Sequence, residues 1–373
     1  MKLPATKLQI VDIDPKKRIL VTSDIHGNLP YFKTLLDKAA FCDEDILIIV
    51  GDIVEKGPDS LGTLRYVMSL CESGNVFPLI GNVDAYRLQV IHDLNSDNAA
   101  SFYRYLLGLR EWCGSSFYDE LANECGYTLN APEDVLRCRD DIVAHFEKEF
   151  HFLSGLPTIL ETQNYTFVHG GLRERKVAQN CARGVFELTK YDDFANKTPH
   201  TFDKYVVVGH WPVSLYSNEI QQLNPVINHE KRIISIDGGC GIKSEGQLNL
   251  LILPSIQSTP KDMTYISYDD IPLIRAREDQ PASADPIHIY WVDRQIKMLT
   301  RGEEFSEVEH MRTGRRLRIL NSYLINDSEC YDYTNYALPV KKGESLSLIT
   351  KSSEGCIVKK DGVVGWYFGE YEE

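Results

Sequence analysis

One arrangement occurs three times between Arg18 and Asp84, and it restricts the folds open to this chain. Each time, a short apolar run ends at a polar residue suited to metal binding, and a helix-like pattern follows. Apolar, β-branched runs separated by amphipathic segments of helix length indicate βαβ units and a parallel sheet. The runs and the segments that follow them are 19–22 before 23–28, 46–50 before 51–59, and 76–80 before 81–84.

The polar side chains at these three places are Asp24, His26, Asp52 and Asn82. In open sheets of α/β proteins, the ligand site lies beyond the carboxyl ends of the strands. We therefore expect these four side chains to converge on one crevice.

Strand-like runs return after residue 164 and end in the same manner. Residues 165–168 precede His169, 205–208 precede Gly209 and His210, and 233–236 precede Asp237, with 248–253 as an antiparallel partner. A single histidine after a strand is ordinarily a packed residue. Three of them (His26, His169 and His210), in the same structural position as the carboxylates and the amide, predict a metal site instead.

The ligand types narrow the choice of metal. Mixed histidine, carboxylate and amide-oxygen ligands suit divalent Mn, Fe, Zn or Ni better than Mg or Ca. Six candidate ligands exceed what one ion with an open catalytic position needs. We therefore expect two divalent ions that share a bridging carboxylate.

Five ordered motifs carry a resemblance to a known family. They are Asp24-x-His26-Gly-Asn, Gly51-Asp52-x-Val54-x-x-Gly57, Gly81-Asn82-x-Asp84, His169-Gly-Gly and Gly209-His210. Over about residues 20–253 the chain resembles the calcineurin-like metallophosphoesterase superfamily. Within it, the chain is most similar to the phosphoprotein-phosphatase branch and to the bacterial symmetrical dinucleoside-tetraphosphate hydrolases.

The resemblance implies a role for each matching residue. Asp24, His26 and His210 would hold a first metal, Asn82 and His169 a second, and Asp52 would bridge them. A hydroxide shared by the metals would attack the phosphate. Asp52, Asp84 and Lys56 are expected to serve catalysis, while the substrate phosphate would be bound by Asn82, Lys56, Arg87 and Arg173.

Two positions depart from the pattern of that branch. The residue after Asn82 is Val83, where the branch has a histidine that protonates the leaving oxygen. Valine cannot donate a proton, so its presence would slow alkyl phosphate hydrolysis more than aryl or phosphoanhydride cleavage. Lys56 stands where the branch often has an arginine, and it supplies charge without a bidentate fork.

The rest of the chain predicts a multi-part α/β (α+β) protein. We expect a metallophosphoesterase β-sandwich flanked by helices over 1–260, with a helical insertion at about 85–155 whose clearest helices are 102–109 and 134–150. The short alternating strands of 287–373 predict a small β-rich module that resembles Src-homology-3-like modules and could bind a protein partner.

Composition excludes some functions and favours one compartment. A net charge of −14 argues against general nucleic-acid binding. The nine scattered cysteines favour reduced thiols, and no apolar run approaches membrane-spanning length. Arg312, Arg315, Arg316 and Arg318 are interpreted as a solvated face. We expect a cytoplasmic protein that makes no membrane contact.

The predicted function is a dinuclear metal-dependent phosphoesterase, most like a serine/threonine protein phosphatase, acting on phosphoproteins or small phosphate esters. One alternative is a nucleotide phosphodiesterase or dinucleoside polyphosphate hydrolase, which Val83 favours. Another is a weakly active metal-binding scaffold that binds other proteins.

Overall fold

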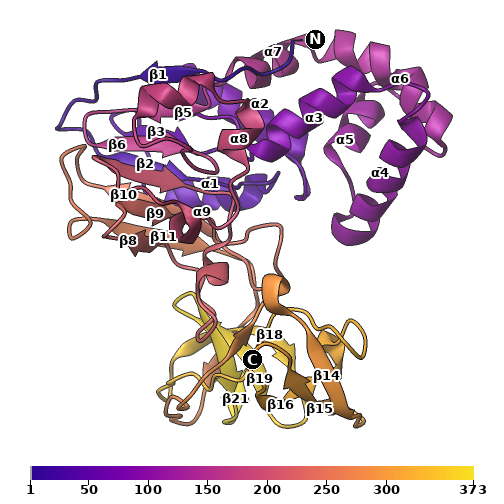
Figure 1. Ribbon diagram of the computed structural model, residues 1–373, viewed down its shortest axis with the longest axis vertical. Helices are drawn as coiled ribbons and strands as arrows, with labels where there is room; N and C mark the ends of the chain where they lie inside the picture. Colours follow the sequence, from indigo (N-terminus) through magenta and orange to yellow (C-terminus); the bar gives the residue numbers. More distant parts are fainter. Residues whose placement is uncertain (1) are drawn as a thin grey trace. The chain divides into compact units, whose positions relative to one another are not determined.

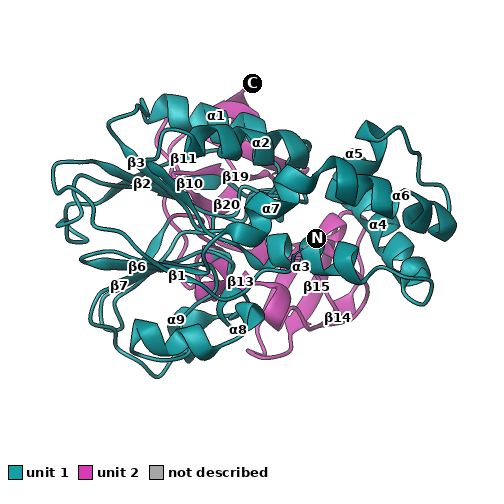
Figure 2. Ribbon diagram, turned by 90° about the horizontal axis from the view of Figure 1, so that it is seen from above, with its two compact units in different colours: residues 1–212, 225–269 teal, residues 213–224, 270–373 magenta. Residues whose placement is uncertain are grey.

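The computed structural model describes residues 2–373. The chain forms two compact units, which Figure 2 shows in different colours. One comprises Met1–Pro212 and Pro225–Asp269, and the other comprises Val213–Asn224 and Asp270–Glu373. The assignment of separate roles to 1–260 and 287–373 stays a prediction.

The first unit contains two sheets (Figure 1). The five-stranded sheet has the order β11 (Thr264–Tyr268), β10 (Leu248–Leu253), β2 (Ile19–Thr22), β3 (Ile46–Ile49) and β4 (Val76–Pro78). Strands β2, β3 and β4 are parallel, whereas β10 runs antiparallel to β2. The three predicted runs therefore end at the same edge of one sheet, as their pattern indicated.

The second sheet has six strands. Their order is β1 (Leu8–Ile10), β5 (Ile159–Glu161), β6 (Tyr165–Val168), β7 (Tyr205–Val208), β9 (Ile233–Ser235) and β8 (Val226–Asn228). Strands β6, β7 and β9 are parallel. His169 and His210 follow two of these strands, so this sheet delivers a second set of polar residues.

Alternating side chains bury both faces of the five-stranded sheet. Ile19 and Val21 of β2 pack with Phe167 and Val207 of the other sheet, which makes a core between the two sheets. Leu20, which points the opposite way, packs with the helices. This is the mixed α/β sandwich flanked by helices that the resemblance implied.

Helices cover the outer faces and form a group beside the sheets (Figure 1). They are α1 (Leu29–Lys38), α2 (Ser60–Cys71), α3 (Asn82–Asp93), α4 (Ala99–Cys113), α5 (Phe117–Glu124), α6 (Pro132–His145), α7 (Glu147–Gly155), α8 (Val185–Thr189) and α9 (Phe194–Lys197). The long helix predicted over 134–150 is wrong: it is two helices, α6 and α7, separated at Phe146. Phe146, whose ring is fully buried, has φ −101° and ψ 29°, outside the helical region, and so interrupts the helix.

The second unit is rich in β-strands. A five-stranded sheet has the order β20 (Val363–Tyr367), β19 (Cys356–Lys360), β18 (Ser345–Lys351), β12 (Leu273–Ala276) and β21 (Tyr371–Glu372). A second sheet contains β14 (Ile296–Thr300), β15 (Phe305–His310) and β16 (Arg316–Leu320), and β13 (His288–Ile289) pairs with β17 (Tyr333–Thr334). The Src-homology-3-like assignment stays a prediction.

Each arginine of the predicted solvated face has an acidic neighbour. The pairs are Arg312 with Asp293, Arg315 with Asp285, Arg316 with Glu309, and Arg318 with Glu354. Their charge is thus balanced locally. Within residues 2–373, none of the helices combines the length and apolarity needed to cross a bilayer.

Candidate metal centre

The first ligand set comes from the loops that follow β2 and β3. Asp24, His26 and Asp52 are buried, and one ligand atom from each lies within 4.8 Å of the other two. Nε2 of His26 is 3.8 Å from Oδ1 of Asp24 and 3.7 Å from Oδ2 of Asp52. Two carboxylates and an imidazole that converge in this way can hold a divalent cation.

The backbone at these loops is held in an unfavourable conformation. Asp24, His26, Asp52 and His210 have φ angles of 57°, 51°, 53° and 66°, in the left-handed region that ordinary side chains avoid. Such residues cost roughly 1–3 kcal/mol each and cluster at functional sites. The left-handed backbone at Asp24, His26 and Asp52 goes with side chains that converge on one place.

A second set of candidate ligands surrounds His169, which follows β6. Its Nε2 lies 2.9 Å from Oδ1 of Asn82 and 3.4 Å from Oδ1 of Asp52. Its Nδ1 lies 2.7 Å from the carbonyl oxygen of Val50. A donor bond from Nδ1 to that carbonyl leaves Nε2, the atom that faces Asn82 and Asp52, as the ring atom that could bind a metal in place of its proton. Asp52 therefore contacts both sets, as a bridging ligand must.

His210 is placed by two hydrogen bonds. Its backbone N–H donates to Oδ2 of Asp24 at 3.1 Å, while Nε2 of its ring lies 2.8 Å from Oδ1 of Asp192. The ring centroid is 5.4 Å from that of His169. The predicted grouping of His210 with Asp24 and His26 stays a prediction, and the position of its ring favours the side of His169.

A family model described as calcineurin-like phosphoesterase matches residues 17–234, more than half of the chain. This chain belongs to the calcineurin-like phosphoesterase family. The resemblance predicted from five motifs is thereby confirmed.

Curated relatives of this calcineurin-like phosphoesterase share one name. The symmetrical bis(5'-nucleosyl)-tetraphosphatase of Cellvibrio japonicus is 27% identical over 219 residues, which cover 58% of this chain and 68% of that protein. The protein of the same name from Buchnera aphidicola is 35% identical over 94 residues, which cover 25% of this chain and 34% of its own length. The chain thus matches only about a third of the length of the first relatives.

Solved structures of low identity are also similar. A protein serine/threonine phosphatase from Saccharomyces cerevisiae has a TM-score of 0.44 and 13% identity, covering 72% of this chain and 85% of that one. A metallophosphoesterase from Sphaerobacter thermophilus has a TM-score of 0.35 and 18% identity, covering 68% and 88%.

The buried carboxylates of the calcineurin-like phosphoesterase site are suited to binding divalent cations. Among residues 2–373, the buried oxygens without a hydrogen-bond partner include Oδ1 of Asp24 and Oδ2 of Asp237. Burial, followed by repulsion from Asp237, raises the pKa of Asp24 well above its ordinary value. Two buried carboxylates with orphaned oxygens are costly unless a cation neutralises them. The donor set therefore fits the metal ions that the family implies.

The same surroundings shift the pKa values of His26 and His169. Burial, followed by the charge of Lys56, lowers the pKa of His26 to about 3. Burial also disfavours the charged ring of His169, but the carboxylates of Asp52 and Asp24 outweigh it and raise the pKa of His169 to about 10. The excess negative charge around His169 is the charge that a cation would neutralise.

Lys56 reaches the predicted centre, whereas Arg87 and Arg173 are engaged elsewhere. Nζ of Lys56 lies 3.2 Å from Nε2 of His26. Arg87 is only 3% exposed and forms an ion pair with Glu55. The Nε of Arg173 donates to the carbonyl of Glu187 at 2.7 Å. The phosphate-binding roles of all three stay predictions, and that of Lys56 has the most direct geometry.

Asp84 lies behind the ligands. Its Oδ1 accepts hydrogen bonds from the backbone of Ile53 and Val54 at 3.0 and 3.2 Å, and its Oδ2 accepts from Gly81 at 2.9 Å. Burial, followed by repulsion from Asp52, raises the pKa of Asp84 to about 6. These bonds join the loop that carries Asp52 to the start of α3. The catalytic role of Asp84 stays a prediction.

Two acidic residues of the site were absent from the predicted ligands. Asp237 follows β9 as Asp24 follows β2, so its position after a strand was an available signal. Asp192 lies in a loop with no motif, and only the fold brings it to His210. The side chain of Asn28, which precedes α1, donates through Nδ2 to the carbonyls of Ile25 and His26 and so braces the loop that carries His26.

Proposed function

We propose that this protein is a metal-dependent hydrolase of phosphoester or phosphoanhydride bonds. The observation that carries the proposal is the contact of Asp52 with both ligand sets: Oδ2 faces His26 and Oδ1 faces His169. Two divalent ions bound here would supply an activated water and neutralise charge on the phosphate oxygens. Asp24, His26 and Asp52 would hold one ion, and Asn82 and His169, with His210, would complete the second set.

The residues of this chain would do the remaining work. Asp84 would keep the Asp52 loop in register with α3 through its three backbone bonds. The N–H of Val83 donates to Oδ1 of Asp52 at 2.8 Å and would orient that carboxylate. The Lys56 ammonium beside His26 would attract the phosphate.

Phosphoanhydrides are the substrate class that we favour. Val83 offers no proton to a leaving group, and a phosphate leaving group needs little protonation. The curated relatives named symmetrical bis(5'-nucleosyl)-tetraphosphatase support the same class. Phosphomonoester hydrolysis of the protein-phosphatase kind is the second candidate, because the motifs of that branch are present apart from Val83 and Lys56.

One experiment tests the proposal at two levels. Elemental analysis of protein saturated with manganese should give two ions per chain, and fewer in Asp52→Asn. Turnover should then be measured on diadenosine tetraphosphate, bis-p-nitrophenyl phosphate, p-nitrophenyl phosphate and a phosphoserine peptide. Two bound ions with no turnover on any substrate would support the scaffold alternative and reject hydrolysis.

A further inference from the structure

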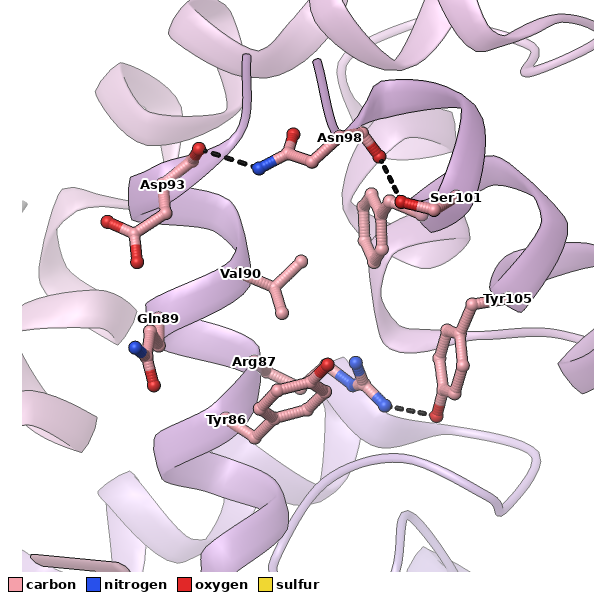
Figure 3. Close-up of a pocket in the computed structure, with 9 residues that line it drawn as sticks. Tyr86, Arg87, Gln89, Val90, Asp93, Asn98, Ser101 and Tyr105 are labelled. Atoms are coloured by element: carbon pink, nitrogen blue, oxygen red, sulfur yellow. Dashed lines mark hydrogen bonds between the residues drawn. The ribbon is translucent and has the colours of Figure 1, made fainter. Parts of the chain in front are cut away.

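A cavity of about 350 Å³ lies between helices α3 and α4 (Figure 3). Its walls include Tyr86, Gln89 and Val90 from α3, and Phe102 and Tyr105 from α4. None of these residues is a predicted metal ligand. The volume falls within the range of about 300–1,000 Å³ that small-molecule sites occupy.

The cavity shares a helix face with the metal centre. Tyr86 follows Asn82 by four residues, and Val90 follows Tyr86 by four, so the three lie on one face of α3. At about 1.5 Å of rise per residue, Tyr86 lies about 6 Å and Val90 about 12 Å along the helix from Asn82. A ligand anchored at Asn82 could therefore extend along this face into the cavity.

Arg87 lines the cavity, and its positive charge is already neutralised. Arg87 forms an ion pair with Glu55, and its Nη2 donates to the hydroxyl of Tyr105. The guanidinium carbon lies 5.3 Å from the ring centroid of Tyr86 and 4.5 Å from that of Tyr105. Because its charge is matched by Glu55, and because Asp93 adds negative charge to the lining, the cavity is unsuited to a phosphate.

The cavity instead offers aromatic surface with polar groups at its edge. Tyr86 is 49% exposed and Tyr105 is 39% exposed, so part of each ring is available to a ligand. Val90 and Phe102 supply apolar contact, while Gln89 presents an amide that can both donate and accept. This combination suits a flat, uncharged, hydrogen-bonding ring.

We propose that this cavity binds a nucleobase of a nucleoside polyphosphate whose phosphates lie at the metal centre. The inference rests on the proposed phosphoanhydride hydrolysis and specifies its substrate. Bases stack on aromatic side chains with little dependence on sequence, and loss of one stack weakens binding by about tenfold or more. Tyr86 is the primary stacking residue, because it is the wall nearest to Asn82 along α3.

Two variants should disrupt the site: Tyr86→Ala removes the stacking ring, and Ser101→Trp fills the cavity from an exposed position. Tyr86→Phe keeps the ring, lacks only the hydroxyl, and serves as the conservative variant. Leu107→Trp, on an exposed position of α4 outside the cavity, is the size-matched control. Each manganese-loaded protein is assayed on diadenosine tetraphosphate and on inorganic tripolyphosphate, which has anhydride bonds but no base.

We expect Tyr86→Ala and Ser101→Trp to raise KM for diadenosine tetraphosphate about tenfold or more, since a lost stack has that magnitude. In Tyr86→Phe and Leu107→Trp, KM for diadenosine tetraphosphate should stay within about twofold of the parent value. KM for tripolyphosphate should not change in any variant.

The outcomes separate this inference from the function on which it rests. If the parent cleaves tripolyphosphate but the cavity variants cleave diadenosine tetraphosphate normally, the base site is rejected and the hydrolase stands. Equal losses on both substrates would also reject it, because they indicate a structural effect. If the cavity variants are also assayed on the phosphoserine peptide and lose activity on that substrate alone, the base site is rejected, because the cavity would then accept a peptide side chain. Failure of the parent on every substrate would reject the hydrolase itself.

Discussion

The carboxylate of Asp192 contacts the ring of His210, with 2.8 Å between Oδ1 and Nε2. The contact lowers the pKa of Asp192, and it leaves Nδ1 as the ring atom free to bind a metal. A carboxylate that fixes a histidine in this way orients the ligand and raises its basicity.

Asp192→Ala should therefore weaken manganese binding. Loss of such a partner typically costs about 10–100-fold in metal affinity, which isothermal titration calorimetry would measure. Asp203→Asn, at an exposed acidic residue paired with Arg175, should bind manganese as the parent does. Equal affinity in the parent and Asp192→Ala would show that Asp192 does not position His210.

Val83→His should restore a proton donor beside Asn82. We expect the rate on a phosphoserine peptide to rise by roughly ten- to a hundredfold, below the about 10²–10⁴-fold typical of an optimised acid. The rate on p-nitrophenyl phosphate should rise less, because its leaving group needs less help. Val83→Gln gives a side chain of similar bulk without the acid, and a similar gain in that variant would contradict the explanation.

Asp84→Asn should destabilise the first unit. An amide group can no longer accept all three backbone bonds, and each buried donor left unsatisfied costs about 1–3 kcal/mol. Urea unfolding with the metals removed would measure the loss separately from metal binding. Asp140→Asn, at a side chain that is 86% exposed, should unfold like the parent.

Metal removal should lower the thermal stability of the parent. The unpartnered oxygens of Asp24 and Asp237 repel one another until a cation neutralises them. Bound metal at 100 times its dissociation constant adds about 3 kcal/mol by mass action. Differential scanning fluorimetry with and without chelator should show the shift, and Asp52→Asn should lose most of it. A parent that melts at the same temperature in both conditions would argue against a metal centre.

Arg18 and Asp45 predict a pH-dependent contribution to stability. Nε and Nη2 of Arg18 donate to the two carboxylate oxygens at 2.8 and 2.6 Å. Burial opposes the effect, but this fork and the N–H of Cys42 lower the pKa of Asp45 in the folded state. The pair therefore stabilises the protein at pH values above the ordinary carboxyl pKa of about 4, and the effect is lost as pH falls through the lowered value.

Arg18→Met should cost about 1 kcal/mol or less at neutral pH, because the pair is partly exposed. Urea unfolding between pH 3.5 and 7 should show a constant difference from the parent above about pH 5, and a smaller one below about pH 4. Arg18→Lys keeps the charge without the fork and should lie between the two. If the difference in unfolding free energy between parent and Arg18→Met grew as the pH fell, the ion pair would not have the pH dependence assigned to it.

Strand ends were the most predictable part of this site. Asp24, Asp52 and His169 each follow an apolar run. Parallel strands bring Asp24 and Asp52 to one edge of the five-stranded sheet, while His169 comes from a strand of the other sheet, which packs against it. The alternation of Ile19, Leu20 and Val21 between two cores likewise follows from the pleat.

Contacts made by distant loops were not predictable. Arg87 has the spacing of a phosphate ligand, but only the folded chain shows that Glu55 neutralises it. Asp192 follows no strand and belongs to no motif, so its contact with His210 depends on where β7 and the loop after α8 meet. The break at Phe146 was not predictable either, since 134–150 keeps helical periodicity across it.

The left-handed backbone at Asp24, His26, Asp52 and His210 bears on why these four positions do not hold glycine. At each of these positions glycine would relax the main chain and make the fold more robust. That exchange would remove four side chains that could bind metal. The chain instead carries an ionisable side chain at all four, so the strained backbone is found where candidate metal ligands stand.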